Sequence, residues 1–490
     1  MVDKLELLTI LNVNQAKPSK RQQSDLRDWH LAAKRARLGA ATPAATNAAT
    51  TKQSEAEAAA PVASTSANGG AGSSVAQALE TGSDFWACNV RPGDGDDGRE
   101  LLAQHAVSLV HKTRSRVIKN NEALAKVASG GGDLGDRDVR DQGFTRPKIL
   151  VLLPFRQSAL VWVQRIVGAA RERHGAESAL NLERFIAEYG LPDGVTDKLA
   201  TDAGNSYPDD HRHTFKGNID DSFRFSLKLT RKQTKLFTDF YSSDFIIASP
   251  LGLRKTIEKE NDADYLSSIE LLIADQLDVM LMQNWDHVSF VLARLNQMPR
   301  DSHGCDFSRV KPPYLDGHAA AHRHSFMISA YETPELRAMY NRELVNVAGK
   351  AKVGGEAGAQ AMQVGLLGAV PRGVKQVFQR FDANDLQGED DTRFSFFTDR
   401  TLPSLLKSAT SSERTLVFVP SYFDFIRLRR HLSKQQQKSG SDEFSFAAIS
   451  EYSSTSEVSR ARAAFYAGRV KFLVITERFH FFHRYVHVRS

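Results

Sequence analysis

The sequence predicts an α/β protein with two domains built on parallel sheets, and three observations favour this fold class. From residue 146 onward, short apolar runs alternate with segments that have the apolar spacing of amphipathic helices. The runs are continuous rather than alternating, which is typical of strands buried on both faces. A Gly- and Ala-rich stretch at 345–372 separates a longer series of runs from a shorter one. Together these features indicate two parallel sheets, each covered by helices.

The first 83 residues are predicted to form a mostly disordered tail. From Pro43 to Ser83 the chain is rich in small and polar residues and has few large apolar side chains. Such a segment cannot bury enough surface to offset the entropy lost on ordering. Two basic clusters, Lys20–Arg21 and Lys34–Arg37, lie before it. They fit either a nuclear import signal or a solvated basic tail.

The first domain is assigned to residues 84–344. A helix is predicted over 101–124, followed by a Gly-rich linker at 129–136. The linker formally matches GxGxxG, but it follows a helix and precedes a strand, which is the wrong context for a phosphate loop. Four strand-then-helix pairs are then predicted, with strands at 148–154, 244–250, 269–275 and 325–329 and helices at 158–170, 253–258, 279–282 and 334–340.

The second domain is assigned to residues 373–490, after a linker at 345–372. Its predicted strands are 415–420, 446–450 and 471–476, and its predicted helices are 422–432 and 455–467. Three strands are few for an α/β domain, which usually has about five or six. We therefore expect this domain to be incomplete.

Composition narrows the class of protein. The formal net charge is 64 − 58 = +6, which permits a nucleic-acid partner without requiring one. Two cysteines, Cys88 and Cys305, form no disulfide framework and fit a reducing compartment. No stretch approaches the roughly 18 apolar residues of a membrane span, and the N-terminus lacks a signal-peptide cleavage site. We expect a soluble intracellular protein without a membrane partner.

The residues at the predicted strand ends resemble the motifs of DEAD-box, superfamily 2 helicases, in order. The resemblance implies two RecA-like, P-loop NTPase-like domains. Ser329-Ala330-Tyr331 resembles the SAT motif, and Thr476-Glu477-Arg478 stands where Thr-Asp is usual. The other matching segments are Pro154–Leu160, which is similar to PTRELA, Ala248–Leu253, which is similar to ATPGRL, Leu272–Asp278, which is similar to the DEAD strand, and Leu416–Pro420.

Departures from these motifs predict that the chain is not an enzyme. ATP hydrolysis needs a phosphate cradle closed by Lys and Ser or Thr, and no GxxxxGK[ST] occurs in the sequence. The carboxylate that would orient water is replaced by Gln276, a neutral amide. We therefore predict no catalytic residue and no cofactor. Asp275 and Asp278 are either remnants of the helicase motif, like Ser329, or caps at a strand end.

Several longer strings resemble the digestive-organ-expansion-factor family. The resemblance covers residues 84 to the end and implies an inactive helicase fold in the small-subunit processome, in the nucleolus. It implies pre-rRNA, U-three snoRNA and other processome proteins as partners, with a role in pre-rRNA processing and small-subunit assembly. Family members continue past residues 476–482, so we expect a truncated second domain. The strings are Lys112–Asn121, Arg140–Pro147, Ala248–Arg254, Leu281–Trp285, Val377–Phe381 and Thr476–Phe482.

Cationic residues near the strand ends are the predicted RNA contacts, because guanidinium groups form charge-assisted bonds with phosphates. The segment from Arg478 to Tyr485 either contacts RNA or forms a buried aromatic cluster with a basic rim. No metal site is expected, because His318, His322 and His324 lie in a loop without other ligands. The predicted RNA-binding residues are Arg156, Ser249, Arg254, Arg478 and Arg484.

Two alternative functions remain open from the sequence. One is an active ATP-dependent RNA helicase with a divergent nucleotide site. The other is a nucleolar scaffold that binds only proteins.

Overall fold

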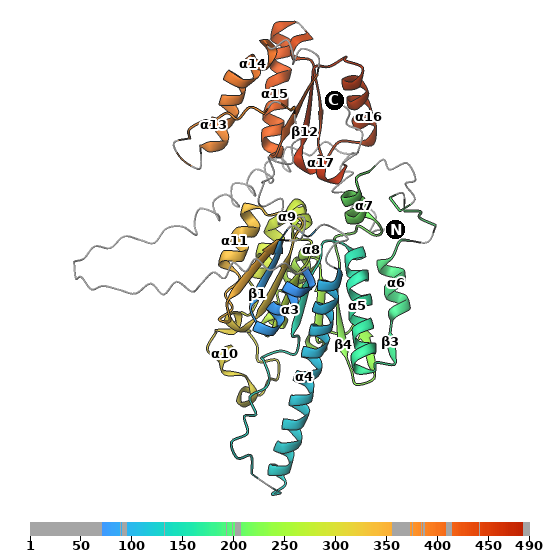
Figure 1. Ribbon diagram of the computed structural model, residues 1–490, viewed down its shortest axis with the longest axis vertical. Helices are drawn as coiled ribbons and strands as arrows, with labels where there is room; N and C mark the ends of the chain where they lie inside the picture. Colours follow the sequence, from blue (N-terminus) through green and yellow to red (C-terminus); the bar gives the residue numbers. More distant parts are fainter. Residues whose placement is uncertain are drawn as a thin grey trace, which may run out of the picture. The chain divides into compact units, whose positions relative to one another are not determined.

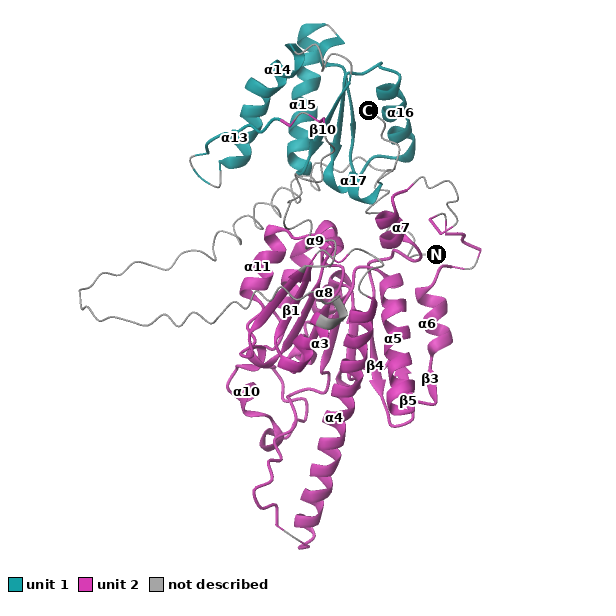
Figure 2. Ribbon diagram, in the orientation of Figure 1, with its two compact units in different colours: residues 1–62, 377–484, 489–490 teal, residues 63–376, 485–488 magenta. Residues whose placement is uncertain are grey.

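The computed structural model describes residues 71–88, 90, 96–131, 133–192, 194–197, 199–200, 207–354, 373–374, 376–383, 385, 388–407, 414–440 and 442–483. The chain divides into two compact units (Figure 2). The larger unit lies within residues 63–376, and the smaller unit includes residues 377–484. Most of the predicted disordered tail, residues 1–70, and most of the predicted linker fall outside the described residues.

The larger unit is built on a nine-stranded, mostly parallel sheet with the order β3-β5-β4-β6-β2-β7-β8-β1-β9. Strand β4 is antiparallel to both of its neighbours, and the other pairs are parallel. The strands are β1 (Asp84–Cys88), β2 (Ile149–Leu152), β3 (Ser178–Leu180), β4 (Arg224–Leu229), β5 (Gln233–Leu236), β6 (Phe245–Ala248), β7 (Leu271–Ala274), β8 (His324–Ile328) and β9 (Lys350–Gly354).

Helices cover both faces of this sheet (Figure 1). On strand β7, Leu271 and Ile273 belong to one apolar core, and Leu272 and Ala274 belong to the other. This burial on both faces explains why the strand reads as a continuous apolar run. The helices are α3 (Ala71–Thr81), α4 (Asp96–Ala128), α5 (Arg156–His174), α6 (Leu182–Tyr189), α7 (Asp209–Phe215), α8 (Pro250–Glu260), α9 (Leu277–Leu292), α10 (Pro312–Leu315) and α11 (Pro334–Arg342).

The smaller unit has a parallel three-stranded sheet with the order β10-β12-β11. Its strands are β10 (Thr415–Val419), β11 (Phe446–Ile449) and β12 (Phe472–Thr476). Two apolar clusters lie on the sheet, one containing Phe425 and Val474 and the other containing Phe465 and Ile475. The helices are α13 (Glu389–Phe396), α14 (Leu402–Lys407), α15 (Tyr422–Ser439), α16 (Thr455–Tyr466) and α17 (Glu477–Phe482), with a π-helical turn at Phe397–Thr401.

The predicted α/β class with parallel sheets is confirmed, and each predicted strand lies where a strand is found. Two segments that were predicted to lack regular structure contain a helix and a strand. Helix α3 lies at the end of the predicted disordered tail, and it is ordered because its Val75 and Ala78 side chains pack into the core. Strand β9 falls in the predicted linker, because its backbone pairs with β1 along its whole length. None of the helices in the described residues is long and apolar enough to cross a membrane.

Candidate functional site at the strand ends

The carboxyl ends of the central strands bring the motif residues to one edge of the sheet. Ala274 of β7 pairs with Leu152 of β2 and with Met327 of β8, so the residues that follow these strands are neighbours. The backbone N–H of Ala330 donates to Asp278 Oδ1 at 2.9 Å, which links the SAT-like segment to the DEAD-like one. Ser329 Oγ accepts from Trp86 Nε1 at 3.0 Å. Asp278 therefore lies beside the segment that contains Ser329.

Asp275 is buried, with 3% of its surface exposed, and it pairs with Arg99 of α4. Arg99 Nε lies 2.8 Å from Asp275 Oδ2, and Arg99 Nη2 lies 3.0 Å from Oδ1. Trp162 Nε1 of α5 donates to Oδ2 at 2.9 Å. Burial alone would raise the pKa of Asp275, but the Arg99 guanidinium and the Trp162 N–H hold it below its usual range. Both carboxylate oxygens are therefore occupied by the chain's own donors.

Arg99 lies in the first turn of α4, the helix that follows β1 in the chain. A phosphate loop joins a strand to the N-terminus of a helix, and β1 is followed by α4 in that way. The sequence of this connection contains Asp94, and the first turn of α4 carries Asp96 and Asp97. The carboxylates of Asp96 and Asp97 would repel a phosphate group at the start of α4. Strand β1 is not among the predicted strands, although the apolar run Phe85–Cys88 before a Gly- and Asp-rich sequence is a strand signal.

Gln276 is held within the fold in a left-handed conformation, with φ 61° and ψ 45°. Its backbone precedes the first turn of α9, and its Oε1 accepts a hydrogen bond from Ser158 Oγ of α5. A side-chain amide carries no basic group that takes a proton from water at neutral pH. The Gln276 side chain is therefore neutral and already engaged within the fold.

Asp278 is the buried carboxylate of this group that has no cationic partner within hydrogen-bond distance among the described residues. Burial raises its pKa to about 6, while the N–H of Ala330 opposes the shift and Asp275 adds to it. A raised pKa in the folded state means that the folded protein binds this proton more tightly than the unfolded chain. The stabilising contribution of the protonated group is present below about pH 4 and is lost as pH rises through about 6.

We therefore expect Asp278→Asn to raise the free energy of unfolding at pH 7 by up to about 3 kcal/mol, which corresponds to about two pKa units. Asparagine keeps an oxygen that accepts from Ala330. Near pH 4 the two proteins should be equally stable. Urea denaturation across this pH range measures the difference, and Asp97→Asn on the exposed first turn of α4 is the control. An Asp278→Asn protein that is less stable at pH 7 than the parent would contradict the expectation.

Arg156, a predicted RNA contact, is used within the larger unit. Its Nη2 lies 3.1 Å from Asp220 Oδ2, and its Nη1 donates to the backbone oxygen of Glu188 at 3.1 Å. The guanidinium also lies 5.3 Å from the centre of the Tyr189 ring. These contacts fix the start of α5 to the segments around it, so both terminal nitrogens of Arg156 are already engaged, while its Nε is buried without a hydrogen-bond partner among the described residues.

Ser249 and Arg254 are also engaged by the fold. Ser249 is 1% exposed, and its Oγ accepts from the N–H of Gly252 at 2.9 Å, so it is the N-cap of α8. A side chain at position 252 would collide with the Phe223 backbone, which explains why glycine stands there. Arg254 Nε donates to Glu258 Oε1 at 2.8 Å, and its guanidinium lies 4.6 Å from the centre of the Phe290 ring.

The remaining two predicted RNA contacts belong to the C-terminal segment. Arg478 lies in the first turn of α17, where Thr476 caps the helix and Phe479 is buried in the core. Thr476 Oγ1 also donates to Glu451 Oε2 at 2.7 Å. The described part of this segment therefore combines a buried ring with a cation. Arg484 lies outside the described residues.

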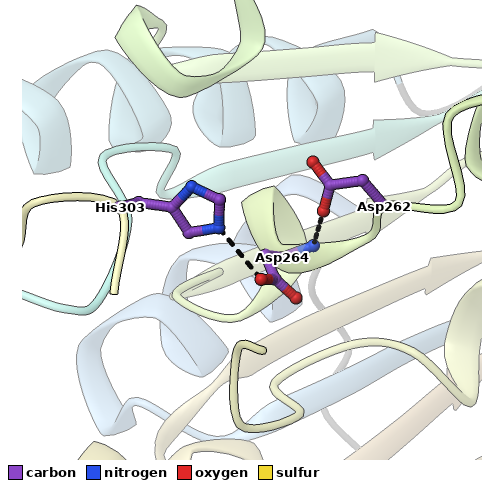
Figure 3. Close-up of side chains that lie close together, drawn as sticks. All are labelled: Asp262, Asp264 and His303. Carbon is purple, nitrogen blue, oxygen red and sulfur yellow. Dashed lines mark hydrogen bonds and ion pairs between the residues drawn. The ribbon is translucent and has the colours of Figure 1, made fainter. Parts of the chain in front are cut away.

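Asp262, Asp264 and His303 form a compact polar cluster near the start of η2 (Asp264–Leu266) (Figure 3). Their ligand atoms are close enough for a metal ion, but hydrogen bonds occupy the carboxylates. Asp264 Oδ2 accepts from His303 Nε2 at 2.9 Å and from the backbone N–H of Arg300 at 2.8 Å. Asp262 Oδ1 accepts from the N–H of Asp264 at 2.8 Å. The cluster fastens the loop around residue 303 to the loop after α8.

Comparison with known proteins places the chain in a family. Residues 82–351 match the family described as "UTP25, NTP hydrolase-like domain", and residues 366–489 match "Utp25, C-terminal domain". The "U3 small nucleolar RNA-associated protein 25" of Arthroderma benhamiae is 44% identical over 397 residues, which are 79% of this chain and 52% of that protein. The Podospora anserina protein of the same name is 43% identical over 417 residues, or 84% and 60%. The chain therefore spans about half the length of the curated relatives it matches.

Among solved structures, a DEAD box protein from Methanococcus jannaschii aligns with a TM-score of 0.27 and 13% identity, over 82% of this chain and 71% of that one. A hypothetical ATP-dependent RNA helicase from Sulfolobus tokodaii aligns with a TM-score of 0.29 and 14% identity, over 84% and 79%. Scores this low carry no weight for the chemistry of the site. The two domain matches and the sequence identities show that the chain belongs to the UTP25 family.

Proposed function

We propose that this chain is an RNA-associated factor of small-subunit ribosome assembly that works without hydrolysing nucleotide. The names of the relatives support U3 small nucleolar RNA as a partner and the nucleolus as the location. Pre-rRNA and other processome proteins are the further partners that the family resemblance implies. In this role the chain takes part in pre-rRNA processing as a binding component.

The pairing of Asp275 with Arg99 is the main observation that supports the proposed lack of nucleotide hydrolysis. In a nucleotide site this strand-end carboxylate would hold a magnesium ion beside the phosphates. Here a guanidinium binds both of its oxygens and an indole N–H binds one of them, in a buried setting. A metal ion would have to displace Arg99, and the displaced cation would then lie buried without its partner. Gln276 and the missing phosphate loop act in the same direction.

Crosslinking in cells tests the RNA-associated role. The tagged full chain should recover pre-rRNA and U3 snoRNA after ultraviolet irradiation, well above a tagged protein of similar charge that has no RNA role. Recovery of processome proteins without any enriched RNA would contradict the proposal and favour the scaffold that binds only proteins.

A further inference from the structure

Helix α4 carries a row of exposed cations that none of the strand-end motifs includes. Lys112, Arg116 and Lys119 are spaced by four and three residues, so they lie along one side of the helix. Seven residues of helix span about 10 Å. With Arg137, which follows α4 in the chain, the row lines a groove of about 560 Å³. Figure 1 shows that this part of α4 extends beyond the strands of the sheet.

Two stacked imidazole rings line the same groove. The rings of His111 on α4 and His174 at the end of α5 are 3.8 Å apart and nearly parallel. Burial lowers the pKa of both imidazoles, and for His111 the neighbouring His174 and Arg114 add to the effect. His174 Nε2 is buried and has no hydrogen-bond partner among the described residues. The groove thus presents cations beside a pair of stacked imidazole rings.

A buried network holds the helix beneath this row in place. Arg309 donates to both oxygens of Asp141, at 2.7 and 2.9 Å, and to Asn121 Oδ1 at 2.8 Å. Asn120 donates to Asp141 Oδ2 at 2.7 Å and accepts from Arg137 Nε at 2.9 Å. The two family-like strings 112–121 and 140–147 therefore meet here. Their polar residues fix the position of α4 and of Arg137.

The cations of the row differ from the predicted strand-end arginines because they are not already paired with carboxylates in the described part of the chain. Within the described residues, Lys112, Arg116 and Lys119 form no ion pair, and all three are exposed. Arg156 and Arg254 instead pair with Asp220 and Glu258. Unpaired cations in a row attract a polyanion and release its counterions on binding.

We propose that the α4 groove, formed by Lys112, Arg116, Lys119, Arg137, His111 and His174, binds the phosphate backbone of RNA. The proposal rests on the RNA-associated function proposed above and assigns that function a surface. The lining favours RNA over an acidic protein segment, because every described residue that lines the groove has a polar or charged side chain. Protein partners bury an apolar centre, whereas nucleic-acid interfaces are more polar and more positive.

Salt-dependent binding of a labelled single-stranded RNA to the full chain tests the site. We expect the combined change Lys112→Gln, Arg116→Gln and Lys119→Gln to reduce the slope of log K against log salt by about 2, since each lost phosphate contact removes about 0.7. Affinity at about 0.05 M salt should fall on the order of a hundredfold. The matched control removes three exposed cations elsewhere in the larger unit, by Lys216→Gln, Lys259→Gln and Arg342→Gln.

The outcomes separate this site from the function on which it rests. The site is supported if the α4 variant loses more RNA affinity and more salt dependence than the control variant, while the thermal unfolding of both variants is unchanged. Wild-type affinity and slope in the α4 variant would overturn the α4 site and leave RNA association standing. An unmodified chain that binds no RNA would instead contradict RNA association itself. Polyglutamate that competes with RNA at equal charge concentration would overturn the assignment of the groove to RNA.

Discussion

Arg99→Met should lower the free energy of unfolding of the larger unit by about 3–5 kcal/mol. The change removes the partner of a carboxylate that is 3% exposed, and an uncompensated buried charge costs about this much. Urea denaturation followed by the fluorescence of Trp162 and its neighbours measures the loss. The stability of the smaller unit, which has its own core, should stay unchanged.

Two further variants separate the charge effect from the loss of packing. Arg99→Met combined with Asp275→Leu should recover most of the stability, because apolar residues of similar size replace a buried ion pair at little cost. Arg165→Met removes a nearby guanidinium whose partner, Asp96, is exposed. It should lower the free energy of unfolding by about 1 kcal/mol or less. Equal losses for Arg99→Met and Arg165→Met would contradict a special role for the Arg99–Asp275 pair.

Arg309→Met should produce a second loss of about 3–5 kcal/mol, through the network under α4. The guanidinium is the partner of Asp141, which is 1% exposed, and it also donates to the backbone oxygen of Val139 at 2.7 Å. Its removal leaves Asp141 charged and buried. Chemical denaturation measures the global loss, and amide hydrogen exchange should show the second half of α4 opening first.

The control for this change is Arg140→Met, because Arg140 is exposed and adjacent in sequence to Asp141. It should change stability by less than about 0.5 kcal/mol. A similar small effect for Arg309→Met would show that the network contributes little and that α4 is held by its apolar face alone.

The strands at the centre of the larger sheet could be predicted from the sequence, whereas β1, β9 and the β3-β5-β4 side of the sheet were not predicted. Strands β2, β6 and β7 are apolar without interruption because both of their faces are covered. Strand β4 alternates polar and apolar residues, and β9 at the sheet edge contains two lysines. Strand β9 pairs with β1, which lies far away in sequence, so only the folded sheet identifies β9 as a strand.

At the site too, features set by neighbouring residues in the sequence could be predicted, and contacts between residues far apart in sequence could not. The contact between Asp278 and Ala330 follows from the neighbouring parallel strands β7 and β8, which end at one edge. The Ser249-Pro250 pair also carried a usable signal, because Ser before Pro is typical of a helix N-cap and first position. The Arg99–Asp275 pair joins residues 176 positions apart, and no local pattern predicts it. The same holds for Arg156, whose partners come from two other segments.

Calorimetric titration of the full chain with magnesium and ATP, with and without RNA, tests the central claim most directly. The closed pairing of Arg99 with Asp275, the neutral Gln276 and the acidic first turn of α4 predict no saturable heat and no release of phosphate. Saturable binding of MgATP that Asp275→Ala abolishes, accompanied by turnover, would contradict the claim and favour an active helicase with a divergent nucleotide site.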